Sequence, residues 1–62
     1  MHMHPIKSLQ DFQMIIDNQW PLCHTVNGIV YNISLMAVLN MKMLDVMEMI
    51  HGNKLFYSKP RN

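Results

Sequence analysis

The stretch PLCHTVNGIVYNIS, residues 21–34, decides the fold because it predicts a β-hairpin through both its turn and its pattern. Asn27-Gly28 suits a two-residue turn in which both central residues have positive φ. Counting outward from this turn gives a register of directly opposed residues, namely Val26–Ile29, His24–Tyr31 and Leu22–Ile33. One face of the hairpin is then apolar apart from His24, as expected for a sheet with one buried face.

The residues before the hairpin, LQDFQMIIDN at 9–18, predict a first helix. Ser8 followed by Asp11 resembles a capping box, with aspartate in place of glutamate or glutamine. Pro21 disfavours the helical conformation in the residue before it and ends the segment. The apolar residues at helical spacing are Phe12, Ile16 and Trp20, with Ile15 at the edge of their face.

The stretch after the hairpin, LMAVLNMKMLDVMEMI at 35–50, carries five of the chain's eight methionines and predicts a second helix. Ser34 and Gly52 occupy the positions that favour the start and the end of such a helix. A membrane span needs about 20 mostly apolar residues, so we expect no membrane association. Wound as one continuous helix at about 100° per residue, the stretch has a core-facing arc that comprises Leu35, Met36, Leu39, Met43, Val46, Met47 and Ile50.

A third strand is predicted over KLFYS, residues 54–58, and is stopped by Pro60. The predicted order is α-β-β-α-β, which indicates a small α+β domain with two helices packed on one face of an antiparallel sheet. We expect a single domain over 1–62, with an N-terminal arm at 1–7 and a C-terminal tail at 58–62.

The size and composition favour a protein partner. A chain of 62 residues buries only about 60% of the surface that its unfolded form exposes, so its stability is marginal without help. Its single cysteine, Cys23, excludes an internal disulfide. Half of the residues are hydrophobic, which excludes a disordered tail, and the net charge is +1. The N-terminus, MHMHPIKS, lacks a charged leader followed by an apolar core, so we expect a cytoplasmic protein.

No constellation predicts chemistry. Cys23 and His24 are neighbours on a strand and point to opposite faces, and nothing supplies a base or nucleophile to the acidic residues. We therefore expect no enzyme activity and no small-molecule substrate. Paired zinc spacings are absent from the sequence, and Met43 and Met47 are better explained by packing than by copper(I) coordination. We expect no metal and no cofactor.

The outer side of the second helix carries apolar residues where a solvated helix would carry charge, namely Ala37, Val38, Met41, Leu44 and Met49. Scattered exposed apolar residues are common, but a cluster is less usual, and methionine adapts to imperfect partners. We expect Ala37, Met41, Leu44 and Met49 to bind a second copy, as a homodimer, or an unidentified protein partner. The chain then belongs with small inhibitors, antitoxin-like regulators or phage accessory proteins.

An alternative is nucleic-acid binding by the C-terminal end, where basic residues alternate with aromatic ones, namely Lys54, Phe56, Tyr57, Lys59 and Arg61. A helix, an Asn-Gly hairpin and a second helix over residues 9–50 form an order that resembles the wing region of small winged-helix excisionases. The resemblance implies nucleic-acid binding. The recognition helix of that family is typically basic, whereas LQDFQMIIDN has two aspartates and no lysine or arginine, so the family is not assigned.

Overall fold

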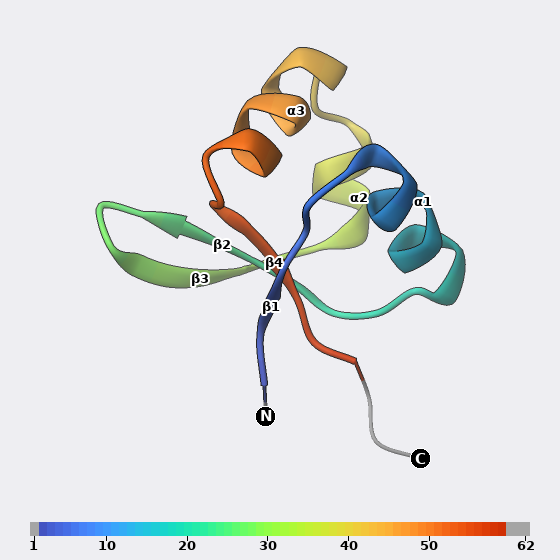
Figure 1. Cartoon of the computed structure of the whole chain (residues 1–62), viewed down its shortest axis with the longest axis horizontal. Coiled ribbons are helices and arrows are strands. Elements are labelled where there is room, and N and C mark those ends of the chain that lie inside the picture. Colours follow the sequence, from blue (N-terminus) through green and yellow to red (C-terminus); the bar gives the residue numbers. More distant parts are fainter. Residues whose placement is uncertain (1, 60–62) are drawn as a thin grey trace.

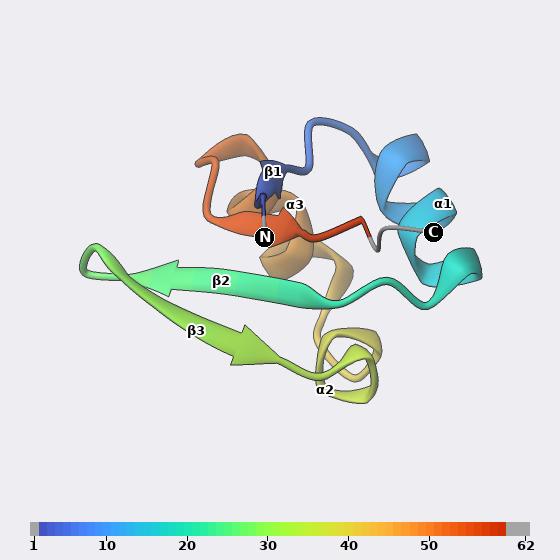
Figure 2. The ribbon, with the colours of Figure 1, turned by 90° about the horizontal axis from the view of Figure 1, so that it is seen from below.

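The predicted hairpin is present in the computed structural model, which describes residues 2–59. Strands β2 (Leu22–Val26) and β3 (Ile29–Ile33) pair in the predicted register, with Val26 opposite Ile29 and Leu22 opposite Ile33. The φ angles of Asn27 and Gly28 are 52° and 80°, as the two-residue turn requires. The turn end of the hairpin extends beyond the helices (Figures 1 and 2).

Two short strands complete an antiparallel sheet in the order β1-β4-β2-β3. Strand β4 (Leu55–Tyr57) was predicted, whereas β1 (His4–Pro5) lies in the segment expected to be an arm. Ile6 follows β1, donates its N–H to the carbonyl of Leu55 at 3.0 Å, and is fully buried. The arm expected at 1–7 therefore supplies a strand and a core residue. Two residues of strand are too few to show a period in the sequence.

Helix α1 (Leu9–Asn18) forms with the predicted bounds and cap. The hydroxyl oxygen of Ser8 accepts a hydrogen bond from the N–H of Asp11 at 3.1 Å. The helix ends at Gln19, which has a left-handed conformation with φ of 54°. Ile15, predicted at the edge of the apolar face, is its fully buried centre.

The prediction of one continuous second helix is wrong, because the chain forms two separate helices in this stretch. Helix α2 (Leu35–Leu39) ends at Asn40, and α3 (Met43–His51) begins after Lys42, whose backbone is extended. Asparagine competes with the helix backbone for hydrogen bonds and favours helix ends. The cap predicted at the start is present, since the hydroxyl of Ser34 accepts from the N–H of Ala37 at 3.1 Å.

The break changes which residues face the core. Val38 is 1% exposed although it was placed outside the core arc. Three residues of that predicted arc are instead exposed, namely Met36, Leu39 and Met43. Leu35, Val46, Met47 and Ile50 are buried or half-buried, as predicted. The extended backbone at Lys42 uncouples the helical phase of α2 from that of α3, so one 100° count cannot describe both.

The strand residues of the core lie on one face of the sheet. Leu22 is opposite Tyr57 and His24 is opposite Leu55, so these positions share a face, and Leu22 and Leu55 are buried there. The helix residues of the same cluster are Phe12, Ile15, Val38, Val46 and Ile50. The domain is α+β with helices packed on one face of an antiparallel sheet, as predicted. Within residues 2–59 no helix is long and apolar enough to cross a membrane.

Candidate partner-binding surface

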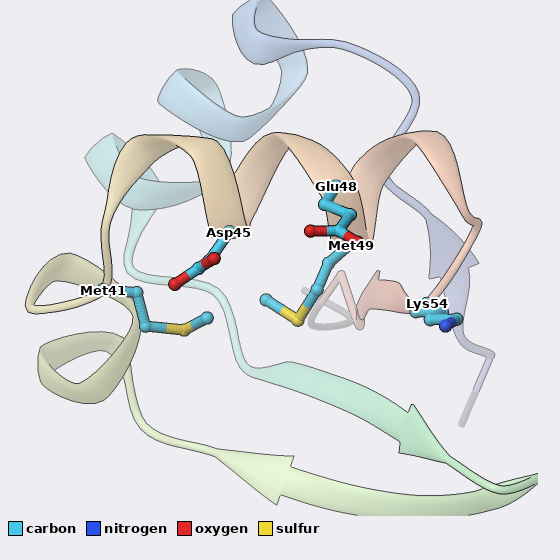
Figure 3. A pocket seen from close by; sticks show the side chains of 5 residues that line it. All are labelled: Met41, Asp45, Glu48, Met49 and Lys54. Atoms are coloured by element: carbon cyan, nitrogen blue, oxygen red, sulfur yellow. The ribbon is translucent and has the colours of Figure 1, made fainter.

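A cavity of about 240 Å³ lies beside α3 and is lined by Met41, Asp45, Glu48, Met49 and Lys54 (Figure 3). Met41 comes from the α2–α3 connection, and Lys54 from the residue before β4. The other three come from α3 itself. Two of the four residues predicted to bind a partner, Met41 and Met49, therefore line the cavity.

The end of α3 places Lys54 at this cavity. Gly52 is the cap residue as predicted, but Asn53 has the left-handed conformation, with φ of 55°. The reversal lets the N–H of Lys54 donate to the carbonyl of Met49 at 2.8 Å. The local sequence after the helix thus fixes the position of the lysine backbone relative to α3.

The rim of the cavity carries charges of both signs around two thioethers. Asp45 and Glu48 are three residues apart, which places them on one face of α3, and both are exposed, as is Lys54. Exposed charges of this kind contribute little to stability. They can instead orient an incoming polar group, while Met41 and Met49 offer it an apolar contact.

The sequence predicts that Met41 and Met49 point away from the core, but they do not. Both are half-buried and pack against the core cluster. For Met41 the reason is the break between α2 and α3, since Met41 lies in the connection and has no helical phase. Ala37 and Leu44 are exposed as expected, and Leu44 is 77% exposed.

Three further exposed apolar residues lie in the same part of the chain and were missed. Met36 is 67% exposed, Met43 is 58% exposed, and Leu39 is 50% exposed. The prediction of one continuous helix places all three in the core. The helix-ending preference of Asn40 was the available signal.

The two described basic residues of the alternative hypothesis, Lys54 and Lys59, are not gathered together. Lys54 and Lys59 lie beyond opposite ends of β4. Lys54 lies at the cavity, whereas the ammonium of Lys59 lies 5.7 Å from the ring centroid of Trp20. Arg61 is outside the described residues.

The two aromatic residues of that hypothesis lie on different faces. Phe56 and Tyr57 are neighbours on β4 and alternate across the sheet. Tyr57 stacks on Trp20, with ring centroids 5.8 Å apart and an interplanar angle of 14°. Phe56 and Tyr57 therefore do not form one stacking platform together.

Cys23 and His24, the candidate reactive side chains, are also separated from each other. Cys23 is buried, and its Sγ lies 3.4 Å from Oδ1 of Asn32 on the neighbouring strand. The ring of His24 contacts that of Tyr31, with centroids 5.9 Å apart, on the opposite face of the hairpin. In the part of the chain that the structure describes, no three His, Cys, Asp or Glu side chains are grouped as metal ligands.

Comparisons of the chain with protein-family models, with curated proteins and with solved structures found no match.

Proposed function

We propose that the chain is a non-enzymatic protein–protein interaction module, a small regulator or inhibitor that binds a partner through its α2–α3 surface. We assign to this surface the exposed apolar residues of the two helices and the five cavity residues, namely Met36, Ala37, Leu39, Met43 and Leu44 with Met41, Asp45, Glu48, Met49 and Lys54. The observation that carries the proposal is the 77% exposure of Leu44, the residue next to Asp45 of the cavity. The partner is a protein that presents an apolar side chain beside a polar or charged group.

The energetics support a protein partner. Burial of a leucine or methionine side chain contributes about 1.5–3 kcal/mol, before the cost of association. Leu44 and Met36 have most of that area still to bury. The half-buried Met41 and Met49 hold the cavity beside them in place, so only a small part of the surface has to become ordered on binding.

Replacing Leu44 and Met36 together with glutamate tests the proposal. Wild-type protein, this double variant and Met14→Glu are immobilised and exposed to an extract of the native cells. Met14 is 44% exposed and lies on α1, so Met14→Glu controls for adding charge to an apolar position elsewhere. Circular dichroism confirms that each variant is folded.

We expect the wild type and Met14→Glu to retain the same protein. Two lost apolar contacts should reduce its retention by the double variant at least about tenfold. Equal retention by the folded double variant contradicts the proposal. So does a wild type that retains nothing and is also monomeric at high concentration.

A further inference from the structure

The two edges of the sheet differ in how they are protected. One edge is β1, which has two residues, one of them Pro5; proline has no N–H to offer another strand. The other edge is β3, a five-residue strand with the sequence IVYNI. It has no charged residue and no proline, which are the usual means of preventing edge-to-edge pairing.

The hydrogen bonds of β2 show which groups of β3 face outward. The N–H of Thr25 donates to the carbonyl of Lys54, on the β4 side of β2. Thr25 lies opposite Val30. Because the N–H of Thr25 points to β4, the backbone groups of Thr25 and Val30 are not hydrogen-bonded to each other across the hairpin. Because bonded and non-bonded pairs alternate along an antiparallel ladder, the pair of Cys23 with Asn32 is likewise non-bonded. Val30 and Asn32 therefore direct their N–H and C=O groups to the free edge.

We propose that β3 pairs with β3 of a second copy of this chain, antiparallel and about a two-fold axis at Tyr31. In this register Val30 lies opposite Asn32 of the second copy, and Asn32 lies opposite its Val30. Both are the residues with outward groups, so the two pairs exchange four backbone hydrogen bonds. Two sheets of four strands join into one continuous sheet.

The side chains of β3 are also self-complementary. On one face Ile29 meets Ile33 of the second copy on either side of a central Tyr31 pair. Ile29 is 56% exposed and Tyr31 is 48% exposed, so both have area to bury. On the other face Val30, which is 46% exposed, meets asparagine. Because β3 carries no charge, two copies do not repel each other at the contact.

The turn end of the hairpin extends beyond the helices (Figure 2), and no other described strand occupies the outer side of β3. This contact uses a strand edge, whereas the proposed function uses helices. Substitutions in β3 and substitutions in α2 or α3 can therefore test the two contacts separately.

Amide hydrogen exchange as a function of protein concentration tests the proposal without a mutation. The amides of Val30 and Asn32 should exchange rapidly at low concentration. They should exchange at least about tenfold more slowly at concentrations where sedimentation shows the dimer. The N–H groups of Ile29 and Tyr31 point toward β2, so these two amides serve as internal references. Two outcomes would overturn this inference. One is a dimer in which the amides of Val30 and Asn32 stay unprotected, and the other is a chain that stays monomeric at millimolar concentration. Neither outcome contradicts the proposed function.

Val30→Pro supplies a matched test. It removes an outward N–H and none of the bonds to β2, and proline is tolerated on an edge strand in that position. Val30→Thr keeps the N–H and is the control. The proline variant should be a monomer and the threonine variant a dimer. If Val30→Pro fails to fold, the double variant Val30→Lys, Asn32→Lys places lysines opposite each other in both pairs and should also be a monomer. A folded proline or lysine variant that dimerises like the wild type overturns the proposal.

Discussion

Val26 and Ile29 lie directly opposite each other at the closed end of the hairpin, and their side chains are 46% and 56% exposed. Neither belongs to the core cluster, so packing contributes little to holding this end of the hairpin. The conformation of Asn27 and Gly28, with positive φ at both residues, is what keeps the two strands in register.

Gly28→Val should destabilise the domain by about 1–2 kcal/mol, because a residue with a Cβ resists the left-handed conformation. A Cβ at this position would meet no atom within 4 Å, so the loss comes from φ and not from a clash. Gly28→Asn is the control, since asparagine tolerates positive φ. Urea denaturation measures both. Equal stability of the two variants would show that φ does not limit the turn.

Lys42→Ser should stabilise the domain by about 1 kcal/mol. Lys42 is the N-cap of α3 but makes no side-chain hydrogen bond to the helix, and a positive charge at a helix N-terminus is unfavourable. Serine would supply the missing acceptor. Lys42→Ala removes the charge without adding an acceptor and should gain less. Thermal denaturation compares them, and a gain for alanine that matches serine would rule out the cap as the cause.

Met41→Glu and Leu44→Glu should differ in their effect on the folded monomer. Met41 packs against the core cluster, so a carboxylate there should cost about 1–3 kcal/mol of stability. Leu44 is 77% exposed, and its change should stay within about 0.5 kcal/mol. Denaturation at low protein concentration, where association is negligible, checks the difference. A loss of the same size at both positions would mean that Leu44 also serves the core.

Nucleic-acid binding should be absent at a salt concentration of about 0.15 M. Lys54 and Lys59 lie beyond opposite ends of β4, and few phosphates can be neutralised at once. Fluorescence anisotropy with a labelled single strand is the measurement. Saturable binding that weakens steeply with salt and is lost in Lys54→Ala, Lys59→Ala would favour the alternative function.

Local signals predicted the hairpin and α1 correctly. An Asn-Gly turn, a serine cap and a Trp-Pro stop act within a few residues, so they can be read without tertiary contacts. Strand β1 could not be found in this way, because its pairing with β4 joins opposite ends of the chain. Two residues carry no period of their own.

The α2–α3 surface was only partly predictable for a related reason. Nearly every residue around Asn40 is apolar, so helical phases on either side of a break fit the pattern equally well. The exposure of Ala37 and Leu44 was anticipated, whereas that of Met36 and Met43 depends on where the break lies. Methionine fits core and surface alike, so its identity does not resolve the phase.

A photo-crosslinking residue at position 44 tests most directly whether the α2–α3 surface binds a protein. The same residue at position 14, on α1, is the control. In an extract of the native cells, position 44 should give one discrete covalent complex, with another protein or with a second copy. Excess unmodified chain should suppress it, and position 14 should give none. No complex at position 44, or the same products at both positions, would contradict a partner-binding role for this surface.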